Sequence, residues 1–290
     1  MKRPAAAREP QSSKPGKALK YLGSPLLDPP KDTEAESVFK VENMIREARR
    51  QLQKPEGPIP SVCVLDPDGD VVKELRRRGD AVQNAHWPCY HSELWQSKIG
   101  EHLVGFVPFI VGAPYAVLVA DELFACGCEL VVHLTSAGEI VPHPQGPSAG
   151  QSFFVMVDRA LRDEGASVHW QPPSMWSEAR DEIFERLPPA AFEGLKKKVH
   201  RGSSWTTDAP FRETQAAIDR AKKLGILCVE MESAALMAFA KATGNAIVSF
   251  AQVTNSMAVQ EGDFEKGDGG GSHDAIELIH ATAAAWSKGC

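Results

Sequence analysis

Hydrophobic positions along this chain alternate between short apolar runs and longer stretches with helical spacing. The short runs, which are typical of buried strands, cover residues 61–65, 103–111, 130–135, 225–230 and 246–253. The helical patterns cover residues 70–78, 113–126, 151–162, 210–223, 231–243 and 274–287. Strands separated by helical segments predict an α/β fold, here a single domain with a central mixed, largely parallel sheet flanked by helices.

The first part of the chain has a different pattern. Residues 1–31 are rich in Pro, Lys, Ala and Ser, and such a segment buries too little apolar surface to offset the entropy of ordering. We therefore predict a disordered basic tail there. Thr33 and Glu36 have the spacing of a capping box, and apolar residues then recur at helical intervals up to Pro55. This predicts an amphipathic helix over 32–54, ahead of a main domain over 58–290.

Composition and charge narrow the class of partner and the compartment. The 290 residues include 32 Lys and Arg against 38 Asp and Glu, a formal net charge of −6, which argues against a nucleic-acid polymer or an anionic membrane as partner. The uncharged stretch 103–120 approaches the length of a membrane span, but Pro108, Gly112 and Pro114 interrupt it, which predicts a strand, a turn and a helix. Six scattered cysteines without a CxxC pair favour a reducing, cytoplasmic compartment.

The strongest candidate site lies within Gly225 to Ala240. In α/β folds ligands bind beyond the carboxyl ends of strands, and here a buried strand leads into Glu230 and Glu232, which flank Met231. Glu232 begins a helix, whose N-terminus favours an anion. Its carboxylate could accept hydrogen bonds from vicinal sugar hydroxyls while Met231 packs on the ring. The alternative is that Glu232 is only a helix-terminal acid and Met231 only a core residue, and position alone leaves both open.

At this motif the sequence resembles the nucleoside phosphorylase and nucleosidase superfamily, which includes uridine phosphorylases. The run Val229 to Ala235 matches its ribose-binding signature. Three more segments resemble the superfamily, in the expected order. Val111 to Glu122 resembles its Gly-rich strand-to-helix turn, and His133 to Ile140 its Thr-Ala-Gly segment. Trp205 to Thr214 resembles the base-pocket segment of uridine-phosphorylase-like members. The resemblance implies that 58–290 is a nucleoside phosphorylase-like catalytic domain, part of a homo-oligomer that cleaves the N-glycosidic bond of a small-molecule nucleoside.

The resemblance also implies roles for individual residues. The ribose would be held by Met231, Glu232 and Glu230; the base would be faced by Trp205, Thr207, Phe211 and Arg212; and the catalytic residues would be Glu232, Asn255 and Asp208. Purine-specific members carry an aspartate in the place of Asn255. Because Asn donates a hydrogen bond but no proton, it favours a pyrimidine. From the residues alone, Arg212 could instead pair with a neighbouring acid, and Asp208 could cap the helix that follows.

The segments expected to hold phosphate depart most from the family pattern. Phosphorolytic members use inorganic phosphate as co-substrate, held by a Gly-Asp-Pro-x-Arg loop after the first strand and by an Arg ahead of the Thr-Ala-Gly segment. Here the loop is LDPDGDVV, with Pro67 and Val71 in the places of its Gly and Arg, and His133 replaces the second Arg. The three aspartates of this loop would hold a phosphate poorly. The candidate phosphate or water site is Gly112, His133 and Ser136. Phosphate could be held there by a protonated His133, by Ser136 with nearby backbone amides, or by an Arg from a neighbouring subunit.

Phosphorolysis is the reaction that the resemblance implies. The alternatives are a hydrolytic nucleosidase, because the phosphate cations are missing, and a binding protein that has lost catalysis. We expect no metal and no cofactor besides phosphate. The glycine-rich run Glu261 to Asp274 has neither a Walker A ending nor EF-hand spacing. It predicts a loop that either closes over the site or only links the last strand to the last helix.

Overall fold

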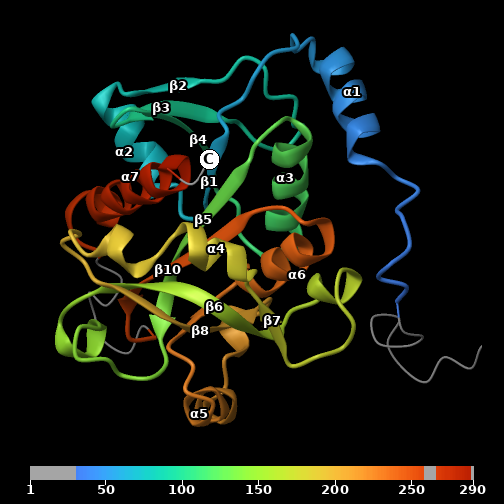
Figure 1. Cartoon of the computed structure of the whole chain (residues 1–290). Helices are drawn as coiled ribbons and strands as arrows, with labels where there is room; N and C mark the ends of the chain where they lie inside the picture. The colour runs from blue at the N-terminus through green and yellow to red at the C-terminus, as the bar shows by residue number, and fades with distance from the viewer. Residues whose placement is uncertain (1–30, 258–265, 289–290) are drawn as a thin grey trace, which may run out of the picture.

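The computed structural model describes residues 31–257 and 266–288 (Figure 1). The predicted tail over 1–31 lies outside this range except for Lys31. The helices are α1 (Val41–Leu52), α2 (Asp70–Arg78), α3 (Ala113–Ala125), α4 (Asp181–Arg186), α5 (Gln215–Lys223), α6 (Ser233–Thr243) and α7 (Ser272–Lys288). The strands are β1 (Val62–Asp66), β2 (Ala81–Gln83), β3 (Trp95–Ile99), β4 (His102–Pro108), β5 (Leu130–Glu139), β6 (Phe153–Asp163), β7 (Trp176–Glu178), β8 (Val199–Thr207), β9 (Cys228–Glu230) and β10 (Ile247–Asn255).

The strands form one mixed sheet in the order β10-β6-β8-β9-β5-β1-β4-β3-β2, with β7 paired to β6. Strand β10 also pairs with β5, so that β10, β6, β8, β9 and β5 close into a ring. The α/β class with a mixed sheet is confirmed. Strand β5 runs parallel to both β1 and β10, and β8 runs parallel to both β6 and β9, whereas β5 and β9 are antiparallel. The carboxyl ends of β1, β5 and β10 therefore meet at one edge.

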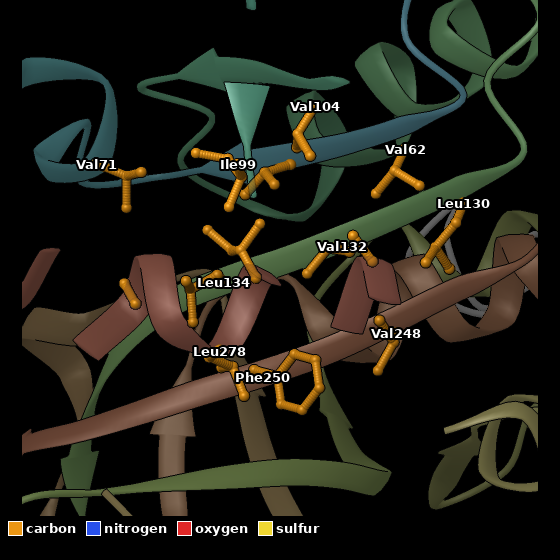
Figure 2. Close-up of a cluster of buried hydrophobic side chains, with 14 of the residues drawn as sticks. Val62, Val71, Ile99, Val104, Leu130, Val132, Leu134, Val248, Phe250 and Leu278 are labelled. Carbon is orange, nitrogen blue, oxygen red and sulfur yellow. The ribbon is translucent and has the colours of Figure 1, made fainter. Parts of the chain in front are cut away.

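Helices cover both faces of the central strands. Helices α2 and α7 lie on one side, and α3 and α6 on the other (Figure 1). On the first side, Val132, Phe250 and Leu278 belong to one buried cluster (Figure 2). Strand β1 contributes Val64 to this cluster and Leu65 to the opposite one. A strand covered on both faces has apolar residues at successive positions, which explains the continuous runs in the sequence.

The uncharged stretch 103–120 is divided between β4 and α3, as predicted. Gly112 begins α3 with φ of 93°, a backbone conformation that residues with a side chain rarely adopt. Pro114 then stands in the first turn of the helix, where its missing N–H costs no hydrogen bond. Within the part of the chain that the structure describes, no helix combines the length and apolar character needed to span a membrane.

The prediction of a helix over 151–162 is wrong, because these residues form most of β6. An uninterrupted apolar run such as Phe153–Val157 suits a buried helix and a buried strand equally, and periodicity does not distinguish them. Pairing with β10 and β8 on its two sides makes it a strand. Strand β8, which carries Trp205 and Thr207, has no predicted counterpart either, because its sequence VHRGSSWTT lacks a regular apolar pattern.

The helix predicted over 32–54 is shorter in the structure. It begins at Val41, after an extended Lys40 that makes no side-chain cap, and the Thr33–Glu36 capping box does not form. Val38 is 99% exposed and Phe39 72% exposed, so an earlier helical turn would have no packing to stabilise it. From Val41 onward, Ala48 is buried, and the Arg49 guanidinium donates to the backbone oxygens of Pro55 and His86.

Candidate active site

Glu230 ends β9 and is held by four donors. Its Oε1 accepts from the hydroxyls of Ser204 (2.9 Å) and Thr206 (2.5 Å), both on the neighbouring strand β8. Its Oε2 accepts from the backbone N–H groups of Glu232 (2.8 Å) and Ser233 (2.7 Å). A carboxylate has about four acceptor positions, so these bonds occupy it fully. Glu230 therefore fixes the β9–α6 turn, and its contact with the ribose stays a prediction.

Glu232 lies at the centre of the candidate site. Its side chain is 1% exposed and that of His133 is fully buried, with 3.3 Å between Glu232 Oε2 and His133 Nε2. Its Oε1 accepts from the backbone N–H of Gly112 at 2.6 Å, and its Oε2 from that of Met231 at 3.3 Å. The turn after β9, strand β5 and the start of α3 thus bring together residues that are distant in sequence. We call Glu230, Glu232, His133 and Gly112 the sugar cluster.

The ionisable groups of the sugar cluster affect one another. Burial raises the pKa of Glu230, and the negative charge of Glu232 raises it further. The neighbouring His133, together with the hydrogen bonds from Thr206 and Ser233, acts in the opposite direction. Because these charged groups share a buried space, a charged ligand that binds beside them would shift the pKa of Glu230 again.

The same three side chains have the composition of a metal site. Among the described residues, His133, Glu230 and Glu232 form a trio whose ligand atoms lie within 4.8 Å of one another. Their hydrogen bonds do not suit this role, because Glu230 accepts from four donors and Glu232 from two backbone N–H groups. These donors would have to be given up for a cation to bind. The arrangement fits a buried acid–imidazole cluster in which hydrogen bonds hold the two carboxylates.

Asn255 lies at the end of β10, beside the sugar cluster. It is 7% exposed, and it pairs in register with Gly138 of β5, which in turn pairs with Val229 of β9. Its Nδ2 donates to the backbone oxygen of Ala137 at 3.3 Å, and its Oδ1 accepts from the N–H of Met257 at 3.1 Å. These bonds fix the side-chain amide and leave the second Nδ2 hydrogen for another acceptor.

The predicted base-binding residues are spread over different environments. Trp205 is buried in an apolar cluster with Leu161 and Val229, and its indole N–H donates to Asp163 at 3.0 Å. Thr207 is buried and accepts from the N–H of Ala209. By contrast, Phe211 is 100% exposed, and Arg212 is also exposed. The structure therefore does not gather these four side chains around one space.

Asp208 does not cap the following helix. Its Oδ2 accepts from the N–H of Gly165 at 2.8 Å, which ties it to the loop after β6. Helix α5 is capped instead by Thr214, whose hydroxyl accepts from the N–H of Ala217. A short 3-10 turn over Pro210–Arg212 separates the two positions, so the single helix predicted over 210–223 is divided.

The segment from the last residue of β1 to the first residue of α2, which we call the acid loop, contains Asp66, Asp68 and Asp70. Asp66 is 3% exposed, and its carboxylate accepts from the N–H groups of Gly69 and Val72, both at 3.1 Å. Burial raises the pKa of Asp66 to about 7. The negative charges of Asp68 and Asp70 also raise this pKa, whereas the hydrogen bonds from the two N–H groups lower it. Asp66 thus uses the amides at the start of α2, where an anion would otherwise bind.

Asp68 and Asp70 both contact the side chain of Lys266, a positively charged residue that the sequence did not predict as part of the site. Lys266 Nζ lies 3.1 Å from Asp68 Oδ2 and 2.8 Å from Asp70 Oδ2. Asp68 Oδ2 also accepts from the backbone N–H of Ser136 at 3.1 Å. Lys266 belongs to the glycine-rich run predicted as a loop, of which residues 261–265 lie outside the described range. No sequence pattern could predict this contact, because Lys266 and the acid loop are far apart in the sequence.

The comparisons with known proteins agree with this geometry. The sequence profile of the phosphorylase superfamily matches residues 61–287. The chain belongs to this superfamily. The match confirms the family predicted from the motifs, and with it a nucleoside phosphorylase-type enzyme that acts on the N-glycosidic bond of small-molecule nucleosides.

Solved structures of the phosphorylase superfamily share the fold. A crystal structure of uridine phosphorylase from Vibrio fischeri ES114 complexed with 6-hydroxy-1-naphthoic acid has a TM-score of 0.63 at 19% identity, covering 78% of this chain and 90% of that one. A second crystal structure of the uridine phosphorylase from the same organism has a TM-score of 0.64 at 20% identity, covering 78% and 93%. No curated protein matches the sequence.

Proposed function

We propose that this member of the phosphorylase superfamily cleaves a nucleoside with inorganic phosphate as co-substrate. A phosphate oxygen forms a bond to C1′ of the pentose while the C1′–N bond breaks. The electron pair of that bond leaves with the base, which takes up a proton. The products are the free base and a pentose 1-phosphate.

The buried carboxylate of Glu232 carries this proposal. It lies in the ribose-signature run, with the N–H groups of Gly112 and Met231 fixing its orientation and His133 3.3 Å away. Glu232 Oε1, which among the described residues accepts only from the Gly112 N–H, has a further lone pair for a sugar hydroxyl. Positive charge grows on the sugar as the C1′–N bond breaks, and a negative group fixed beside it in a water-poor site stabilises that charge. Met231 is half-buried and packs on the sugar ring. Because the Glu232 side chain is only 1% exposed, the side chains that cover it must move before the sugar can reach it.

We propose a pyrimidine nucleoside as the substrate. Support comes from Asn255, whose side-chain amide is held by Ala137 and Met257 beside the sugar cluster. Its second Nδ2 hydrogen donates to a carbonyl oxygen of the base and stabilises the negative charge that the base takes with it. An amide cannot donate a full proton, so a base that leaves without prior protonation suits this site better than a purine.

A hydrolytic nucleosidase is the second candidate. The observation in its favour is that Asp68 and Asp70 already occupy the Lys266 ammonium, and Asp68 the Ser136 N–H. With those donors taken, water could attack C1′ in place of phosphate. For either reaction we propose a homo-oligomer, as the family resemblance implies. We propose that it acts in the cytoplasm, which the scattered cysteines favour.

The test is to incubate the full chain with uridine, inosine, adenosine and methylthioadenosine, with and without phosphate. Base release is followed by chromatography, and the sugar product is identified as pentose 1-phosphate or free pentose. We expect uridine to be cleaved fastest and only with phosphate. Equal rates without phosphate would establish hydrolysis, faster cleavage of a purine nucleoside would contradict the role of Asn255, and no base from any nucleoside would refute the proposed function.

A further inference from the structure

Two donors from distant parts of the chain converge on one oxygen of Asp68. The Ser136 N–H and the Lys266 ammonium both lie 3.1 Å from Asp68 Oδ2. A backbone N–H together with a cation is the combination that proteins use to bind oxyanions, because both bonds strengthen with negative charge on the acceptor. The chain therefore contains a built pair of oxyanion donors, and its own carboxylate occupies them.

This donor pair lies close to the sugar cluster. Ser136 follows His133 by three residues on β5, and His133 is 3.3 Å from Glu232. Three residues of strand span roughly 10 Å. A phosphate bound by Ser136 and Lys266 would be next to a sugar held by Glu232, which is where an attacking phosphate has to be.

The remaining donors of the acid loop are also paired with aspartates. The N–H groups of Gly69 and Val72 donate to Asp66, and Asp70 shares Lys266 with Asp68. Burial alone would lower the pKa of Lys266, but hydrogen bonds and charges from Asp70 and Asp68 raise it above its ordinary value, so the ammonium stays charged. Phosphate can take up these donors only by replacing a carboxylate.

Asp68 can be replaced more easily than Asp66. Its side chain is 35% exposed, whereas Asp66 is 3% exposed and fixed by two N–H groups. A partly exposed ion pair contributes only about 0–1 kcal/mol, so turning Asp68 out to solvent costs little. Asp70 would still hold Lys266 in place, since its own contact with the ammonium is independent of Asp68.

We propose that Asp68 is an intramolecular competitor of phosphate: its carboxylate occupies the Ser136 N–H and the Lys266 ammonium, and it thereby sets the affinity of the enzyme for phosphate. The inference rests on the proposed function. It makes Asp68 a specificity-determining residue that decides between phosphate and water as the nucleophile. It also assigns to Lys266 the role of the phosphate cation that the loop after β1 lacks.

The experiment compares three variants of the full chain in uridine cleavage at varied phosphate concentration. Asp68→Asn removes the competing charge, and we expect an apparent KM for phosphate about tenfold lower than in the wild type, with the KM for uridine as internal reference. Asp70→Asn is the matched control, because Asp70 contacts Lys266 but not the Ser136 N–H; its change should be smaller. Adding Lys266→Met to Asp68→Asn should reverse the gain.

Several outcomes would overturn the inference. These are an unchanged or higher KM for phosphate in Asp68→Asn, an equal effect of Asp70→Asn, or a gain that survives Lys266→Met. A wild type without phosphate dependence, combined with phosphate-dependent cleavage by Asp68→Asn, supports it. If no nucleoside is cleaved, the proposed function fails, and calorimetric titration of inorganic phosphate decides the inference alone: Asp68→Asn must then bind phosphate more tightly than the wild type.

Discussion

The sugar cluster and the acid loop both place carboxylates at the ends of strands, but they use them differently. In the sugar cluster, Glu230 is buried and accepts from four donors that belong to the β8–β9–α6 framework. In the acid loop, Asp68 is partly exposed and shares a single ammonium with Asp70. The first arrangement is a rigid support, and the second is an ion pair that a ligand can exchange.

The largest expected effect is on stability and would test this contrast directly. Glu230→Ala leaves four buried donors without an acceptor, and each such group costs about 1–3 kcal/mol, partly relieved by rearrangement. We expect the free energy of unfolding to fall by roughly 3–5 kcal/mol, measured by urea denaturation. Asp68→Ala, by comparison, should change it by less than about 1 kcal/mol. Similar losses in the two variants would show that the acid loop is as rigid as the sugar cluster.

The next effect is on activity. Glu232→Ala should lower kcat/KM for uridine by about 100-fold or more, because two hydrogen bonds to a charged group contribute roughly 1.5 kcal/mol each or more. Circular dichroism of the variant should match that of the wild type. Glu193→Ala, at an exposed glutamate, is the control and should leave the rate unchanged. A Glu232→Ala enzyme of normal activity would mean that the sugar binds elsewhere.

The sequence predicted the sugar cluster better than the acid loop, and the reasons are physical. Helix α2 begins and ends where its apolar pattern predicts, at Asp70 and Arg78. Gly112 and Glu232 were predicted as candidates because each follows a strand, and strand ends meet at one edge of an α/β sheet. His133 was predicted by resemblance, because it replaces the family's Arg ahead of the Thr-Ala-Gly segment. The structure brings these three together.

Other features depend on contacts that no local pattern contains. Lys266 reaches Asp70 across 196 residues, from a run whose only marked property is its glycine content. Strand β6 is decided by its neighbours β10 and β8, and the role of Glu230 by the hydroxyls of Ser204 and Thr206 on an unpredicted strand. The base segment was predicted by resemblance alone, and Phe211 lies exposed in the structure.

The smallest expected effect sharpens the contrast through pH. Burial raises the pKa of Asp66 to about 7, above the value of about 3.9 for an exposed aspartate in the unfolded chain. Between these values the folded state binds more protons than the unfolded state, so the contribution of Asp66 to stability falls as the pH rises from about 4 to about 7. Asp66→Asn cannot ionise and should lack this slope.

Urea unfolding at about pH 5 and about pH 8 measures the slope in both proteins. Between these two conditions the wild type should lose roughly 1–3 kcal/mol more than Asp66→Asn. Glu213→Gln is the matched control: burial also raises the pKa of Glu213 to about 7, but Glu213 lies outside the acid loop, so this variant should keep the slope due to Asp66. Equal slopes in the wild type and Asp66→Asn would mean that Asp66 stays charged when buried. The acid loop would then hold three negative charges beside one lysine, and phosphate would have to compete with all of them.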